Sequence, residues 1–139
     1  MRKSLIVLLT LCLAITSCED KHNHLGNLNG NWQLTSWVRT NDGTLLADKQ
    51  SGIYYSVSIS LMKIWKVNDH GKYYMTTFRN ANDSLIITQV HASPFDSIVP
   101  VSSLADYGVP DNGGFRIVQL NSTNMTLMGG DNTLTFRRY

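Results

Sequence analysis

The sequence predicts an all-β domain, a meander of antiparallel strands that forms a sandwich or a barrel. Short segments rich in β-branched and aromatic residues alternate between apolar and polar positions, and clusters of Asn, Asp and Gly separate them. Successive segments joined by such short turns pair most simply as antiparallel hairpins. The chain has 139 residues, enough for one domain, and we place this domain at residues 28–139.

The first 17 residues have the layout of a secretory signal peptide. Met1-Arg2-Lys3 is a basic start, an apolar run over 5–15 is too short to span a bilayer, and small residues follow. The ending Ile15-Thr16-Ser17-Cys18 also resembles the lipobox of bacterial lipoproteins. This resemblance implies that Cys18 is acylated and becomes the mature N-terminus.

Residues 18–27 are expected to form a lipidated polar tether. Cys12 leaves with the signal peptide, so Cys18 is the one cysteine of the mature chain and no internal disulfide can form. The acidic start of the tether, Glu19-Asp20, resembles the surface-export signal of some Gram-negative lipoproteins. We therefore expect attachment to the outer membrane through the lipid on Cys18, with either the periplasm or the cell surface as the facing compartment.

Alternation predicts the strands of the domain in order. The first contains Trp32, Leu34 and Val38 on one face. The longest extended run is expected to be one strand over 53–67 with a bulge or bend near 61–63. Turn signals of the type Asn-Asp-His-Gly bound the later strands, which we place at 72–79, 84–90, 115–120, 125–128 and 133–138.

The region 91–114 interrupts this rhythm and contains all three prolines. Within it, residues 102–108 predict one short helix, with Ser102 as its N-cap and Gly108 as its stop. A long loop inside a compact domain is often a lid or a binding element. The alternative is a plug over one end of the domain, with Leu104 and Tyr107 pointing inward.

Two short motifs resemble the lipocalin-like domains of Gram-negative (Bacteroidetes-type) lipoproteins: Gly30-Asn31-Trp32 on the first strand and Leu134-Thr135-Phe136-Arg137-Arg138 on the last. The resemblance implies a small antiparallel up-and-down β-barrel of about seven to eight strands. It also implies that Trp32 closes one end of the barrel beneath Arg138, or alternatively Arg137, in a structural cation–π pair. The chain lacks the disulfide and the long C-terminal helix of large lipocalins, so their ligands are not implied.

Charge and motif content exclude several functions. Arg2 and Lys3 account for the net charge of +2, which leaves 10 basic against 10 acidic residues and no basic run for nucleic acid. The four histidines are scattered without metal-ligand spacing. No nucleophile elbow or phosphate-binding loop is present. We therefore expect no metal, no cofactor and no enzymatic activity.

The remaining hypotheses concern binding. A barrel of about eight strands either holds a small ligand or is filled by side chains. For an apolar or amphipathic ligand, the candidate pocket residues are Tyr55, Tyr73, Met75, Phe115 and Met125. If the barrel is filled, outward rings are expected to dock an envelope protein or inhibit a hydrolase, with Tyr54, Tyr74, Trp37 and Trp65 as the candidates.

Two tripeptides, Asp83-Ser84-Leu85 and Asp96-Ser97-Ile98, resemble the sequon of bacterial periplasmic O-glycosylation. The resemblance implies sugar on Ser84 and Ser97 in a host that has this system.

Overall fold

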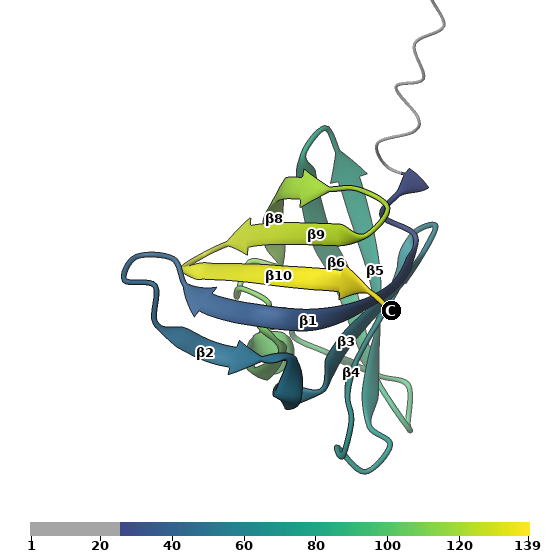
Figure 1. The fold of residues 1–139 in the computed structure, drawn as a ribbon. Coiled ribbons are helices and arrows are strands. Elements are labelled where there is room, and N and C mark those ends of the chain that lie inside the picture. The colour runs from purple at the N-terminus through teal and green to yellow at the C-terminus, as the bar shows by residue number, and fades with distance from the viewer. Residues whose placement is uncertain (1–25) are drawn as a thin grey trace, which may run out of the picture.

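Residues 26–139 are described by a computed structural model, and this part of the chain contains ten strands in one continuous sheet (Figure 1). Eight of them close into an antiparallel barrel, because β10 pairs with β9 on one side and with β1 on the other. The fold is therefore the predicted all-β barrel. The closing strands are β1 (Gly30–Arg39), β3 (Ile53–Ser58), β4 (Leu61–Lys66), β5 (Tyr73–Ala81), β6 (Ser84–Ala92), β8 (Gly114–Leu120), β9 (Asn124–Gly129) and β10 (Asn132–Arg138). The predicted signal peptide and Cys18 lie outside the described residues.

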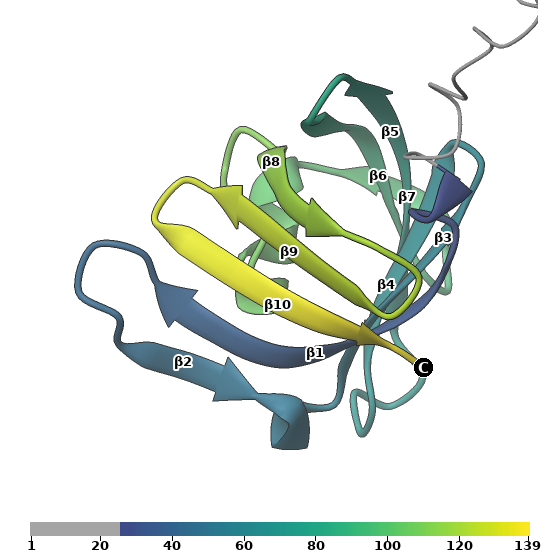
Figure 2. The same ribbon diagram turned by 45° about the horizontal axis from the view of Figure 1, so that its top comes forward.

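Two short strands extend the sheet beyond the closed ring. β2 (Leu45–Asp48) pairs with the second half of β1, whereas β3 pairs with the first half of the same edge. β7 (Ser97–Val99) pairs with the end of β6. Together β1 and β2 form an arm that projects beside the barrel, as the two ribbon views show (Figures 1 and 2).

The prediction of one strand over 53–67 is wrong, because β3 and β4 form a tight hairpin with Ile59 and Ser60 at its turn. Ile59 has a φ of 56°, a left-handed conformation that is rare for a β-branched residue. Its backbone N–H donates to Asn29 Oδ1 at 2.9 Å, which holds the turn in place. An apolar residue at a turn position continued the strand pattern in the sequence and concealed the turn.

The interior of the barrel is packed with apolar side chains from all eight closing strands. Trp32, Tyr55 and Phe136 are the largest of the fully buried ones. Thr76 is polar but buried, and its hydroxyl donates to the carbonyl of Met62 at 3.1 Å. Hydrophobic burial of this extent is the main contribution to the stability of a domain without disulfides.

A 3-10 helix, η3 (Val101–Tyr107), lies at the end of the barrel where β1 ends, because Gly108 directly after it accepts a hydrogen bond from Asn132, the register partner of Arg39. Leu104 is fully buried and Tyr107 nearly so, as predicted for a plug. Gly108 ends the helix at a φ of 87°, also as predicted, but Ser102 is not its cap. The helix starts one residue earlier, after Pro100, with no side-chain cap bond. Although the helix plugs it, we call this end of the barrel the open end. The opposite end, at Trp32, is called the closed end.

Candidate functional site

The closed end is built around Trp32 and Arg138. The Arg138 Cζ lies 4.4 Å from the centroid of the Trp32 ring, and the Trp32 indole N–H donates to the carbonyl of Leu28 at 2.8 Å. The structure thus brings together the pair that the sequence resemblance implied. Both side chains are engaged with protein atoms, so this end is a structural closure.

Arg138 also joins β10 to the segment before β1 and to the β8–β9 turn through backbone carbonyls. Its guanidinium donates to the carbonyls of Asn27, Asn29 and Ser122 at 2.6–2.8 Å. Gly30 makes room for it: a Cβ at this position would overlap the guanidinium, and its φ of 138° favours glycine. A side chain at position 30 would therefore displace the guanidinium from its present position.

The five candidate pocket residues do not line one pocket. Tyr55, Phe115 and Met125 lie inside the barrel, where they pack in the core. Tyr73 and Met75 face outward, because β5 turns Thr76 and Phe78 toward the interior instead. The interpretation of these five as a common interior wall is wrong: adjacent tyrosines must point to opposite faces, and Tyr74 takes the inner one.

A chain of hydrogen bonds holds the plug in the open end. The Tyr55 hydroxyl donates to the carbonyl of Tyr107 at 2.7 Å, and the Tyr107 hydroxyl donates to Asp69 Oδ2 at 2.7 Å. On the other side, the Asn132 amide donates to the carbonyl of Gly108 at 3.0 Å. The plug is thus tied to β3, to the β4–β5 turn and to β10.

The two buried tyrosines predict a loss of stability in alkali. Burial raises the pKa of Tyr55 far above its usual value of 10.0, and burial together with the bond to Asp69 does the same for Tyr107. Between pH 10 and these raised values, the folded state keeps protons that the unfolded state loses. The free energy of unfolding should therefore fall as the pH rises above about 10, by about 1.4 kcal/mol per pH unit for each tyrosine.

Urea denaturation at a series of pH values checks this expectation. Above pH 10, Tyr55→Phe should reduce the fall in unfolding free energy by about 1.4 kcal/mol per pH unit. Tyr107→Phe should have the same effect. Tyr139→Phe is the matched control, because that side chain is 71% exposed. A Tyr55→Phe slope equal to that of the wild type would contradict the assignment.

A groove of about 490 Å³ lies beside the plug, between the β1–β2 arm and the barrel. Leu45 and Leu46 project from β2 and are 59% and 42% exposed. The residues that line it are Trp37, Leu45, Leu46, Ala47, Asp48, Gln50, Ser51, Ile53, Lys66 and Asp106. This open-end groove combines an apolar floor with three charged side chains, two acidic and one basic, so it is the candidate functional site. Its volume lies within the range of small-molecule sites.

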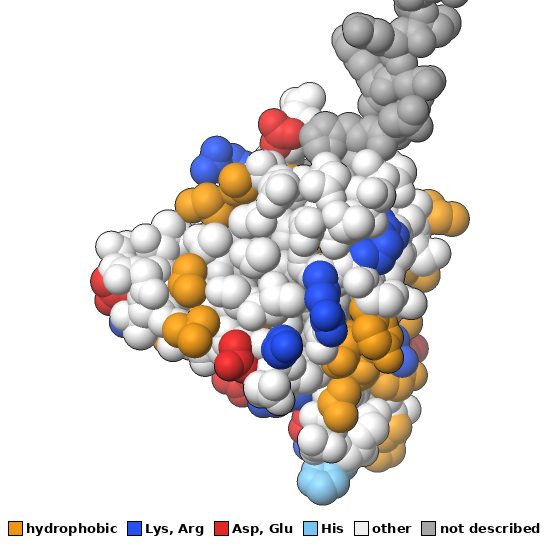
Figure 3. Space-filling model, in the orientation of Figure 1, with side chains coloured by type: hydrophobic (Ala, Val, Ile, Leu, Met, Phe, Trp, Pro, Cys, Tyr) orange, Lys and Arg blue, Asp and Glu red, His pale blue; other side chains and the backbone are white. Residues whose placement is uncertain are grey.

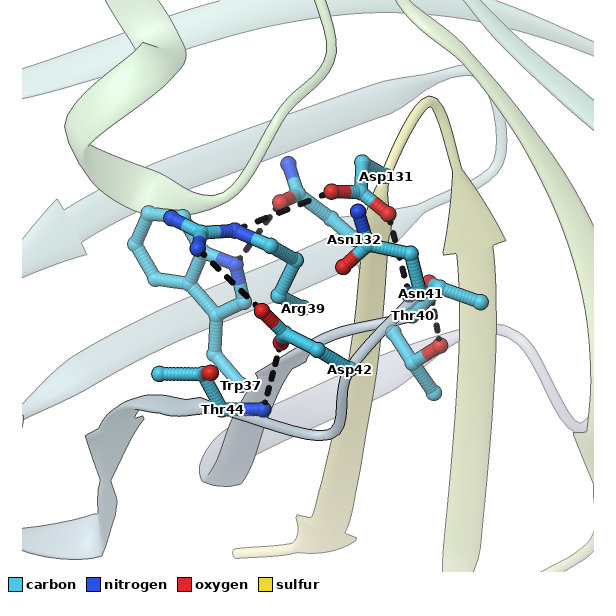
Figure 4. Close-up of polar contacts among 9 residues, drawn as sticks. Trp37, Arg39, Thr40, Asn41, Asp42, Thr44, Asp131 and Asn132 are labelled. Carbon is cyan, nitrogen blue, oxygen red and sulfur yellow. Dashed lines mark hydrogen bonds and ion pairs between the residues drawn. The ribbon is translucent and has the colours of Figure 1, made fainter.

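The arm that forms one wall of the groove is braced at its corner (Figure 4). The Trp37 indole N–H donates to Asn132 Oδ1 at 3.0 Å, so the same Asn132 side chain holds both the arm and the plug. Arg39 lies between Asp42 and Asp131, at 3.5 and 3.7 Å. Hydrogen bonds from Thr44 lower the pKa of Asp42. These contacts join the β1–β2 turn to the β9–β10 turn.

A second hollow of about 330 Å³ adjoins the open-end groove and shares Gln50, Ser51 and Lys66 with it. It reaches Asp69, which holds the plug. Of the groove residues, only Trp37 was expected at a binding surface, and the others were missed in the sequence. The available signal was the adjacent pair Leu45-Leu46, one residue after the Asn-Asp-Gly turn, which is too short a segment to be recognised as a strand.

A separate cluster of rings lies on the outer face of the barrel. Tyr54 stacks on Trp65 with centroids 5.2 Å apart, and Tyr139 meets Tyr54 edge-on at 5.1 Å. Figure 3 shows hydrophobic side chains gathered over β3 and β4 near the C-terminus. Two residues expected in such a patch are elsewhere: Tyr74 packs inward on Tyr107, and Trp37 lines the groove.

Other candidate features were also located. Within residues 26–139, no group of three or more His, Cys, Asp or Glu side chains could hold a metal ion. His91 Nδ1 lies 2.9 Å from Asp96 Oδ1 near the β6–β7 turn. Ser84 and Ser97 are exposed at the starts of β6 and β7, and their glycosylation stays a prediction. The described part of the chain also contains no helix long and apolar enough to cross a membrane.

The closed eight-strand ring, with an arginine over a tryptophan at one end and an open groove at the other, defines a small lipocalin-like barrel. The model of the lipocalin-like domain family matches residues 11–139. The chain belongs to this family.

Solved structures share the fold at low sequence identity. A lipocalin-like protein from Bacteroides uniformis is 18% identical with a TM-score of 0.60, over 82% of this chain and all of that one. An uncharacterized protein from Bacteroides eggerthii is 19% identical with a TM-score of 0.56, over 80% of this chain and 98% of that one. A protein from Burkholderia xenovorans is 18% identical with a TM-score of 0.51, over 80% and 82%. A comparison with curated proteins found no match.

Proposed function

We propose that this protein is a lipid-anchored envelope protein that binds a small amphipathic molecule in the open-end groove. The observation that carries the proposal is the exposure of Leu45 and Leu46 over a hollow of about 490 Å³. Apolar side chains held in water at a concave surface lose that water when an apolar ligand covers them, and this favours binding.

The groove is favoured over the barrel interior as the binding site. Inside, Tyr55 and Met125 are fully buried, and the Tyr55 hydroxyl is already bonded to the plug. A ligand entering there would have to displace close-packed side chains. The groove requires no such rearrangement.

The lining of the groove indicates the chemistry of the ligand. Its apolar part would lie on Leu45, Leu46 and the Trp37 ring. Its polar part would meet Lys66, which is exposed and borders both hollows, or Asp106 from the plug. A molecule with a flat or branched apolar body and one charged group fits this arrangement, and an anionic group would meet Lys66.

The anchoring part of the proposal rests on residues outside the described structure. The order of basic start, apolar run and Ile-Thr-Ser-Cys supports acylation of Cys18. The acidic tether supports the outer membrane as the destination, at the periplasmic face or the cell surface. No catalytic or cofactor role is part of the proposal.

Fluorescence titration with anilinonaphthalene sulfonate, an aromatic anion, tests the groove. The double variant Leu45→Asp/Leu46→Asp removes the apolar floor without disturbing the core, and we expect its Kd to rise about tenfold or more. The matched control is Ile98→Asp, because Ile98 is equally apolar and 66% exposed but lies on β7. Equal Kd values for the double variant and the wild type would contradict the proposal.

The outer ring cluster favours a second candidate function, docking of another envelope protein. Tyr54, Trp65 and Tyr139 form a contiguous aromatic surface of the kind found at protein interfaces. If Trp65→Ala raises the Kd of the dye and the leucine double variant does not, the dye binds at this surface and not in the groove.

A further inference from the structure

We propose that the β3–β4 turn, with Ile59 at its tip, contacts the lipid bilayer to which the N-terminal segment attaches the chain. This inference rests on the lipid anchor of the proposed function and adds to it a second contact and an orientation. The partner is the apolar part of a phospholipid bilayer near its headgroups.

In the protein without a membrane, Ile59 has both an unfavourable exposure to water and an unfavourable backbone conformation. Its side chain is 84% exposed, and its backbone has a φ of 56°. Glycine or asparagine would occupy this conformation with less strain. Strained residues that the surrounding structure holds in place are concentrated at sites of function, and here the Asn29 side chain holds the turn.

The tip lies where the described chain begins. Asn29, which bonds to Ile59, comes three residues after the first described residue, Gly26. Arg138 fixes this entry through the carbonyls of Asn27 and Asn29.

Chain length places this end near the membrane. Eight peptide units separate Cys18 from Gly26 (26 − 18 = 8), and they can span about 30 Å at most. The barrel cannot move farther than this from an acylated Cys18. Since the chain enters at the closed end, Ile59 is within reach of the bilayer.

The same geometry orients the groove. β1 runs from the closed end toward the open end over 10 residues, about 33 Å of extended strand. With the closed end against the bilayer, the open-end groove faces the aqueous phase. A ligand could then reach Leu45 and Leu46 without passing through lipid.

The contact should be apolar in character. Residues 59–61 are Ile, Ser and Leu, and Leu61 is also 46% exposed. No charged side chain lies within this tip, so higher salt should not weaken the contact, in contrast to a surface held by basic residues.

A fluorescent label tests the inference in the full-length lipidated protein. Ile59→Cys would be labelled with the polarity-sensitive dye nitrobenzoxadiazole and the protein reconstituted into phosphatidylcholine vesicles. Leu45→Cys, labelled in the same way, is the control at the opposite end. An acylated Cys18 has no thiol to label, so each variant should carry one dye.

Three outcomes are distinguishable. We expect the protein to float with the vesicles, and the dye at position 59 alone to shift to the blue and be quenched by lipids with a nitroxide in the upper acyl chain. Flotation with identical spectra at positions 59 and 45 would overturn the membrane contact but leave the anchor standing. A protein that stays in solution and carries a second dye on Cys18 would overturn the anchor and the contact together.

Discussion

Replacing Trp32 with alanine is expected to lower the free energy of unfolding by about 3–5 kcal/mol. The ring is fully buried at the closed end, with Arg138 against one face and its N–H bonded to Leu28. Its removal leaves a cavity and takes away the surface on which the guanidinium rests. The free energy of unfolding of small domains is about 5–15 kcal/mol in total, so the variant would lose much of the stability. Urea denaturation followed by far-ultraviolet circular dichroism measures it.

Trp65→Ala is the matched control for this prediction. Trp65 is also a tryptophan on a barrel strand, but it faces outward and stacks on Tyr54. Its loss should cost about 1 kcal/mol, the contribution of a surface aromatic pair. Equal losses for the two variants would mean that the closed end is not a centre of stability.

Arg138→Lys separates charge from geometry at the same end. Lysine keeps the positive charge over the ring but has no planar fork to reach the carbonyls of Asn27, Asn29 and Ser122 together. We expect a loss of about 1–3 kcal/mol, since hydrogen bonds from a charged donor to these exposed and part-buried carbonyls are lost. A lysine variant as stable as the wild type would assign the role of Arg138 to its charge alone.

Replacing Cys18 with serine is expected to move the protein from the membrane fraction to the soluble fraction almost completely. Each buried methylene of an acyl chain contributes about 0.8 kcal/mol, so several chains hold a protein firmly. The Ile59 contact alone would contribute about 3 kcal/mol at most, too little to retain the protein through washing. Cell fractionation followed by immunoblotting measures the change.

Ser17→Ala is the control for the cysteine variant, because it keeps a small residue before the cleavage position and leaves the thiol. This variant should remain with the membrane. If Cys18→Ser also remains there, the attachment does not depend on acylation, and the lipoprotein part of the proposed function is wrong.

The proposed ligand site is a groove exposed to water at the open end, next to a plug that hydrogen bonds hold in place. It is not a cavity inside the barrel. The plug is tied at Tyr55, Asp69 and Asn132. Asn132 also braces the arm of the groove, and Asp69 borders the adjoining hollow. A ligand in the groove would therefore touch the same framework that closes the barrel. Binding should raise the stability of the plug by linkage.

The sequence by itself determined the class of fold and the closed end. Alternation with period two is a local property of each strand, and Asn, Asp and Gly clusters mark most turns, so the meander could be predicted. The Gly-x-Trp motif and the terminal arginine indicated the closing pair. Gly108 as the end of the plug helix also followed from local chemistry, because only glycine enters the left-handed region without strain.

Only the tertiary structure decided which face each strand turns inward and where its ends lie. Pairing with β4 and β6 turns Thr76 and Phe78 of β5 inward, so Tyr73 and Met75 lie outside although their pattern suits either face. The turn at Ile59 was hidden because a contact with Asn29, distant in sequence, holds a residue that local preference excludes. The groove arises from the arm and the plug, two segments far apart in the chain, and no local pattern encodes their approach.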